Sequence, residues 1–199
     1  FKLNNIWPEL QTTIRLRRQI VLFIHQHNTI CRETYMEKMF QILETAWPAV
    51  KTTGLTGCVT APETEDNLLL FEDKYATHIP KDYRQLLSHF GACHFVDPQI
   101  YTLKDLDRYY PLFLQQWEDY KKEYPLLNNI DPFPVGSFGD GSVAFLDRNS
   151  LKIYILIHDF GIFSDDVGDF PCELCFENFG ELVEMQVEII LYLQQCGVS

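Results

Sequence analysis

The residues best suited to chemistry are cysteines and histidines in the central and C-terminal parts of the chain. Cys172 and Cys175 form a Cys-x-x-Cys pair, and His89, Cys93 and His94 could supply a second pair of metal ligands. A structural zinc site needs that second pair, because the ion takes four ligands. Leu174 and Phe176 interleave with the cysteines and favour buried structural thiols instead. We therefore predict no cofactor, and a zinc protein or enzyme built on these side chains is the alternative that metal analysis would decide.

Three other motifs each lack part of the chemistry that they would need. The acidic run Asp165–Asp169 has neither the ligand spacing of an EF-hand nor its bidentate glutamate. Phe138–Ser142 (Phe-Gly-Asp-Gly-Ser) has no lysine and is predicted to be a turn rather than a phosphate loop. His158–Asp159 could belong to a nucleophile triad, but no Gly-x-Ser-x-Gly elbow accompanies it. We predict a protein without catalytic activity.

Besides these motifs, the negative charge of the chain could act on a partner. The 199 residues contain 16 Lys and Arg against 28 Asp and Glu, which gives a net charge of −12. No Lys or Arg follows Lys152, whereas nine acidic residues do. A nucleic-acid backbone calls for a basic face, so direct nucleic-acid binding is not expected. Nor does any apolar run reach the length of a membrane-spanning helix.

The acidic residues of the C-terminal part gather in one loop and on one helix. A helix is expected over 176–195, where Glu177, Glu181, Glu184 and Glu188 share a face at about 100° per residue. No lysine supports them at i+4, so this surface is either a plain solvated face or a contact for a basic protein. The residues that we predict to bind a partner are Asp165, Asp166, Asp169, Glu173, Glu177 and Glu181.

Hydrophobic spacing predicts an α-rich start followed by mixed helices and strands. The expected helices are 9–27, a second ending at Trp47, one that begins at Pro80 and ends at Gly91, and 103–123. The expected strands are Leu68–Phe71, which follows an exposed loop over 51–67, then 95–101, and a hairpin of 142–146 with 152–158. Helices and strands in blocks, with a hairpin, favour an α+β fold over a doubly wound parallel one.

Several segments, taken in order, are similar to a known family. His78–Gly91 resembles the helix signature of the SMI1/KNR4 (SUKH) superfamily, and Phe133–Gly136 with Gly139–Ser142 is similar to its Phe-Pro-Val-Gly…Gly-Asp-Gly passage. The next strands of the family are resembled by two segments, Val143–Asp147 and Ile153–Asp159. The start of the family's final helix is resembled by Cys175–Val183. The resemblance therefore covers most of the chain after residue 77.

The resemblance implies an α+β fold in which helices pack a curved, mainly antiparallel sheet. It also implies a protein-binding domain without catalysis over residues 78–199. Residues 1–77 are then expected to form an N-terminal helical extension and loop. Many bacterial members of the family look like immunity proteins, which bind and neutralise toxins.

The leading hypothesis is an immunity protein that neutralises a cognate basic toxin, such as a nuclease. Six cysteines in a chain with an ample core favour a reducing cytoplasm. The alternative is a regulatory or adaptor SUKH module of a eukaryotic or viral protein. The sequence leaves open the identity of the partner and the oligomeric state.

Overall fold

The computed structural model describes residues 40–41, 44, 60–92, 98–157 and 172–195. The chain divides into two compact units, 1–38 and 39–199, and every described residue belongs to the second. The predicted helix over 9–27 lies outside this part. Phe40, Gln41 and Glu44 are helical, as predicted for the second helix. Within the described residues, no helix combines the length and apolar character that crossing a membrane requires.

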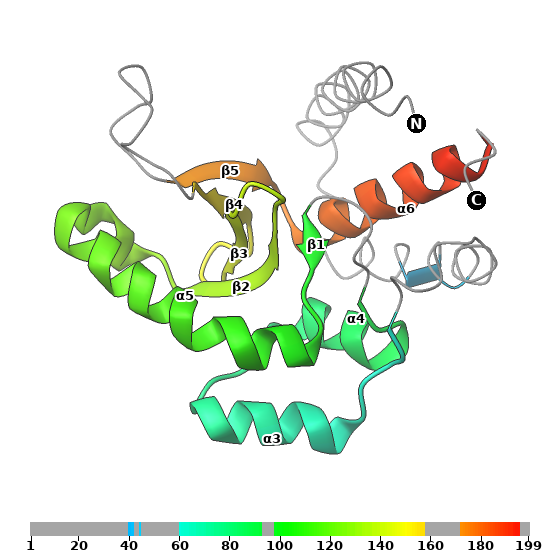
Figure 1. Ribbon diagram of the computed structural model, residues 1–199, viewed down its shortest axis with the longest axis horizontal. Helices are drawn as coiled ribbons and strands as arrows, with labels where there is room; N and C mark the ends of the chain where they lie inside the picture. Colours follow the sequence, from blue (N-terminus) through cyan, green and yellow to red (C-terminus); the bar gives the residue numbers. More distant parts are fainter. Residues whose placement is uncertain (1–39, 42–43, 45–59, 93–97, 158–171, 196–199) are drawn as a thin grey trace. The chain divides into compact units, whose positions relative to one another are not determined.

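Five antiparallel strands form one curled sheet, which resembles half of a barrel (Figure 1). The strands are β1 (Gln99–Ile100), β2 (Pro132–Ser137), β3 (Val143–Asp147), β4 (Ile153–Leu156) and β5 (Cys172–Phe176). Their order in the sheet is their order in the chain, so each strand pairs with the next. The predicted α+β class, the curved antiparallel sheet and the β3–β4 hairpin are confirmed.

Helices flank and connect these strands. They are α3 (Glu65–Tyr75), α4 (Lys81–His89), α5 (Leu103–Glu123), the 3-10 helix η3 (Pro125–Asn129) and α6 (Phe179–Gln195). Helix α5 has the predicted bounds, and a capping box begins it. The Thr102 hydroxyl accepts the Asp105 amide hydrogen at 3.0 Å, and the Asp105 carboxylate accepts the Thr102 amide hydrogen at 2.9 Å.

Helix α3 corrects the prediction of a loop over 51–67 followed by a strand at Leu68–Phe71. The Thr64 hydroxyl accepts the Asn67 amide hydrogen at 3.3 Å and caps the helix, which ends at Ala76 in the left-handed region. A run of four apolar residues suits a buried strand or a helix equally well. The polar cap before the run, and not the run itself, decided the element.

Helix α6 corrects a second prediction, that of a helix from residue 176. It begins at Phe179, because residues 172–176 form strand β5. Leu182 and Val183 are buried, as the predicted apolar face requires. Buried Gln186 donates a hydrogen bond of 2.7 Å to the Pro98 carbonyl and ties α6 to the segment before β1.

Side chains cover both faces of the sheet, because neighbouring strand residues point in opposite directions. On one face, Phe145 packs against Phe113 and Trp117 of α5, with ring centroids 5.9 and 5.0 Å away. On the other, Phe133 lies 5.4 Å from the ring of Tyr110. Burial on both faces explains why β2 and β3 are nearly continuous apolar runs rather than alternating ones.

Candidate functional site

The segments that carry the family resemblance meet in one aromatic cluster. The ring of Tyr83 on α4 lies 6.2 Å from that of Phe133 on β2 and 5.4 Å from that of Phe179 at the start of α6. All three side chains are fully buried. The Tyr83 hydroxyl donates a hydrogen bond of 2.5 Å to the Tyr101 carbonyl, and burial raises its pKa well above the ordinary value. These motif residues therefore build the core and offer no open reactive group.

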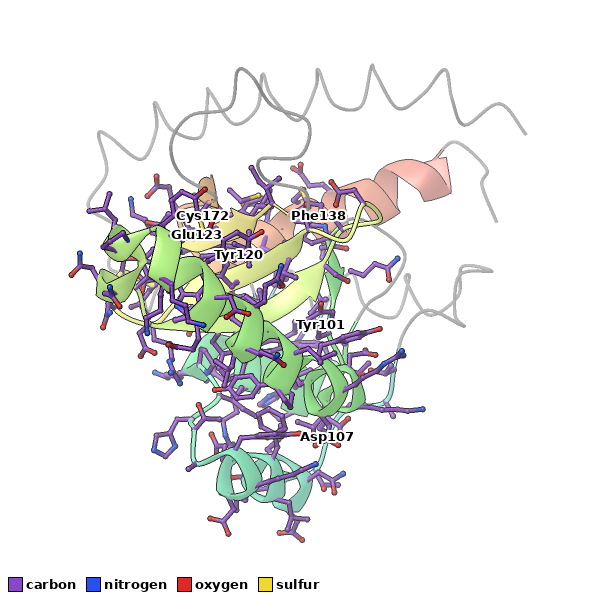
Figure 2. All side chains as sticks on the ribbon, turned by 60° about the vertical axis from the view of Figure 1, so that its left-hand side comes forward. Tyr101, Asp107, Tyr120, Glu123, Phe138 and Cys172 are labelled. Atoms are coloured by element: carbon purple, nitrogen blue, oxygen red, sulfur yellow. The ribbon has the colours of Figure 1, made fainter. Side chains whose placement is uncertain are left out.

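The Cys-x-x-Cys pair lies on β5. Cys172 is buried in the cluster formed with Phe145 and Trp117, against which Tyr120 of α5 also packs (Figure 2). Cys175 is half-buried, at the point where the pairing of β5 with β4 shifts register. Of the three residues that could supply a second pair, His89 is the exposed last residue of α4, and Cys93 and His94 lie outside the described residues. In the part of the chain that the structure describes, no three His, Cys, Asp or Glu side chains are grouped closely enough to hold a metal ion.

Burial raises the pKa of the Cys172 thiol to about 12, from a usual value near 9. At pH 8 its thiolate fraction is lower by roughly 1000-fold, and the greater nucleophilicity of a more basic thiolate recovers part of that loss. We expect iodoacetamide to alkylate Cys172 at least about 10-fold more slowly in the folded chain than in urea, because burial both raises the thiol pKa and blocks access to the sulfur. Peptide mass spectrometry of timed samples measures both rates. Equal rates would contradict a buried structural thiol.

The predicted partner-binding residues lie close together in sequence, within 165–181, but they do not share one element. Asp165, Asp166 and Asp169 lie outside the described residues, so the predicted acidic loop stays a prediction. Glu173 is on β5, paired in register with Ile155 of β4.

Glu177 and Glu181 are brought together beside a lysine. The Glu177 carboxylate lies 2.8 Å from the Lys152 ammonium, and this hydrogen bond is the main cause of the raised pKa of Lys152. Glu181 is the third residue of α6, where its carboxylate accepts the Glu177 amide hydrogen and its own amide donates to Asn178, both at 3.1 Å. Glu177 precedes the helix, so the predicted stripe of four glutamates on one helix is wrong at this position. The last basic residue of the chain neutralises part of that surface.

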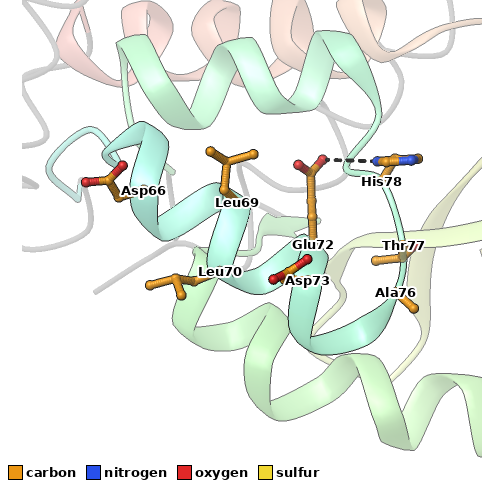
Figure 3. Close-up of a pocket in the computed structure, with 8 residues that line it drawn as sticks. All are labelled: Asp66, Leu69, Leu70, Glu72, Asp73, Ala76, Thr77 and His78. Carbon is orange, nitrogen blue, oxygen red and sulfur yellow. Dashed lines mark ion pairs between the residues drawn. The ribbon is translucent and has the colours of Figure 1, made fainter.

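A different acidic surface, which sequence reasoning missed, lies on α3. Asp66, Leu69, Leu70 and Asp73 are spaced i, i+3, i+4 and i+7 and fall within about 100° of the helix circumference. We call these four residues the α3 face. They line an open pocket together with Glu72 and residues 76–78 (Figure 3). The signal that could have found it is Thr64 followed by two acids, which is typical of a helix start.

Most charged groups around the α3 face are paired within the fold. Arg84 of α4 holds both carboxylate oxygens of Glu65 at 2.7 and 2.8 Å, which lowers the pKa of that carboxyl, and it lies 3.6 Å from Glu72. Among the described residues, neither Asp66 nor Asp73 forms a salt bridge. These two carboxylates are therefore available to a partner.

A defect in α5 helps to hold α3 in place. Pro111 lies inside α5 and has no amide hydrogen, so the Asp107 carbonyl one turn earlier loses its helical partner. The Tyr75 hydroxyl at the end of α3 donates to that carbonyl at 2.8 Å. Lys74 pairs with the Asp107 carboxylate at 2.6 Å, and that hydrogen bond chiefly lowers the pKa of Asp107 (Figure 2).

The connection from α3 to α4 is held by the β3–β4 turn. The Arg148 guanidinium forms two hydrogen bonds with the Asp131 carboxylate, at 2.5 and 2.9 Å, and donates to the Thr77 hydroxyl at 2.9 Å and the His78 carbonyl at 3.3 Å. Buried Asp147 orders the same turn by accepting from the amide and hydroxyl of Ser150. Two residues of the pocket, Thr77 and His78, are thus hydrogen-bonded to the β3–β4 turn.

Comparison with known proteins assigns the chain to no family. The chain matches no protein-family model, and no curated protein matches its sequence. The residues and the fold are therefore what a functional proposal must rest on.

Proposed function

We propose that this chain is a non-catalytic, protein-binding domain of the SUKH type, and that it acts as an immunity protein in the cytoplasm. The observation that carries the proposal is the ordered run of family-like motifs between His78 and Val183. Three buried aromatic residues from these motifs, Tyr83, Phe133 and Phe179, pack together at 5.4 and 6.2 Å. Residues that make a core in this way support a shared fold, and the surface is then left to bind the partner.

The negative charge of the chain suits a basic toxin as its partner. A nuclease binds a polyanion, so an inhibitor with a net charge of −12 can compete for the same basic site. Complementary charge also speeds association, to about 10⁸–10⁹ M⁻¹s⁻¹ at low salt. We place this contact at Asp165, Asp166 and Asp169, since Glu177 is already paired with Lys152.

The second candidate is a regulatory or adaptor module. The α3 face favours it, because α3 lies outside the family-like segment and adds a second surface to the one at 165–169. An adaptor joins two partners, whereas an immunity protein needs only its toxin. A toxin gene beside the gene for this chain would support the first proposal, and further domains on the full-length protein would support the second.

The test uses the product of the neighbouring gene as the binding partner. We expect the triple charge reversal Asp165→Lys, Asp166→Lys and Asp169→Lys to slow association about 10-fold or more at low salt and to flatten its salt dependence. Stopped-flow measurements at several salt concentrations give both quantities.

A matched control separates the local surface from the net charge. Glu118→Lys, Asp119→Lys and Glu123→Lys change the charge by the same amount on exposed positions of α5. If both triple variants slow association equally, the net charge alone is the cause. An unchanged rate for the first variant would reject the contact at 165–169.

A further inference from the structure

We propose that the α3 face binds a basic helical segment of a partner protein, in which two aliphatic side chains are flanked by Lys or Arg. The inference rests on the proposed protein-binding function and adds a surface and a recognition chemistry to it. Four residues carry it: Leu69 and Leu70 supply apolar area, and Asp66 and Asp73 supply charge (Figure 3).

The apolar part of the α3 face is more exposed than the fold requires. Leu69 and Leu70 are 50% and 67% exposed, although Leu68 and Phe71 beside them are buried. The buried pair already attaches α3 to the domain, with the ring of Phe71 5.7 Å from that of Tyr110. The exposed pair is therefore not needed for packing within the described residues, and it lines a pocket. Two neighbouring exposed leucines form one apolar area rather than a single scattered residue, and this area lines the pocket.

The charged part of the α3 face determines which partner fits. Asp66 and Asp73 are seven residues apart, about 10.5 Å along the helix, with the two leucines on either side of the line that joins them. Neither has a cationic partner among the described residues, whereas Glu65 and Asp107 beside them do. A helix carrying Lys or Arg at the same spacing would pair with both carboxylates.

The same charges argue against a second copy of the chain as the occupant. Two α3 faces packed on each other would bring the carboxylates of Asp66 and Asp73 against those of the other copy. Like charges in an interface are unfavourable, so self-association needs a cation that the α3 face does not supply. Beside Glu72 at the rim lies a cation, Arg84, but it is already paired with that carboxylate, which also accepts the Ile79 amide hydrogen.

The experiment uses the full chain and a labelled helical peptide with the pattern Lys-x-x-Leu-Leu-x-x-Lys. Fluorescence anisotropy at low and physiological salt measures binding. We expect Leu69→Ser with Leu70→Ser to weaken binding about 10-fold or more, and Asp66→Asn with Asp73→Asn to weaken it several-fold and flatten its salt dependence. The matched control, Leu126→Ser with Glu123→Gln, alters exposed positions on η3 and at the end of α5 and is expected to bind as the unaltered chain does.

Several results would overturn the inference: no binding, equal binding of a peptide with Glu in place of Lys, or equal binding by the α3 variants. So would a dimer in sedimentation that the leucine substitutions dissociate. If the serine variant does not fold, the asparagine variant decides, since it alters only exposed carboxylates.

The neighbouring-gene product separates this inference from the proposed function. A partner that binds the chain but ignores every α3 substitution refutes only the inference. A chain that binds the peptide but not the gene product refutes only the proposed toxin.

Discussion

Replacing Phe133 by alanine is expected to lower the free energy of unfolding by about 3–5 kcal/mol. The side chain is fully buried between Tyr83 and Tyr110, whose rings lie 6.2 and 5.4 Å away. Its removal loses apolar burial and leaves a cavity that rigid neighbours cannot fill. Because Phe133 joins α4 and α5 to the sheet, the loss falls on the whole domain. Urea denaturation followed by circular dichroism measures it.

Leu126 offers the control for Phe133. It is 69% exposed on η3, so Leu126→Ala is expected to change the free energy of unfolding by less than about 0.5 kcal/mol. A Phe133→Ala variant as stable as the control would contradict the aromatic core. It would also remove the main physical support for the family resemblance, since Phe133 lies in one of its motifs.

Replacing Gly91 by alanine is expected to cost about 2–5 kcal/mol of unfolding free energy. Gly91 follows α4 with φ +78°, in the left-handed region that side chains disfavour. A Cβ atom there would clash with the Thr60 carbonyl oxygen, a backbone atom that cannot move alone. The Thr60 amide donates to the Ala92 carbonyl at 3.1 Å, and the Ala92 amide donates to the Thr60 hydroxyl at 2.8 Å, so moving Thr60 to relieve the clash would also disturb these two hydrogen bonds.

The variant Gly136→Ala separates the cost of the steric clash from the cost of the left-handed backbone conformation. Its Cβ would lie 2.5 Å from the Gln99 carbonyl oxygen, but its φ is not positive. Gly136→Ala is therefore expected to lower the free energy of unfolding through the steric clash alone, by about 1–3 kcal/mol. Thermal unfolding of both variants gives the comparison. A Gly91→Ala variant that loses no more than Gly136→Ala would show that the left-handed conformation contributes nothing.

Both predictions concern motif residues, and both place them in the structure of the domain rather than in its surface. A variant of Phe133 or Gly91 should therefore lose partner binding only in proportion to its loss of folded protein. Variants of the α3 face should behave in the opposite way and weaken binding without a change in stability. Measuring stability and affinity on one set of variants separates the two roles.

Several elements could be predicted because their signals are local. Helix α5 has its capping box at Thr102 and Asp105, and Gly91 follows α4 where a left-handed residue ends a helix. The hairpin of β3 and β4 follows from two apolar runs around a turn that Asp147 closes. Caps and turns lie within a few residues of the groups that they satisfy, so a sequence window contains the whole interaction.

Other elements were predicted wrongly because their partners are distant in sequence. For Leu68–Phe71, the cap at Thr64 is local, but the contacts that hold the helix on the domain are distant: the ring of Phe71 packs on that of Tyr110, and the Tyr75 hydroxyl donates to the Asp107 carbonyl. Glu177 was assigned to the last helix, but its pairing with Lys152 and the strand before it shift the helix start to Phe179. Contacts of this kind appear only when the chain folds back on itself.

The α+β class and the acidic character can be read from the sequence, and so can the order of the segments that resemble the family. These depend on composition and on spacing along the chain, which folding does not change. Only the tertiary structure decided which charges act together. It paired Glu65 with Arg84, Asp107 with Lys74 and Glu177 with Lys152, and it left Asp66 and Asp73 beside two exposed leucines. The physical reason is that charges interact over a few ångströms, and folding alone sets those distances.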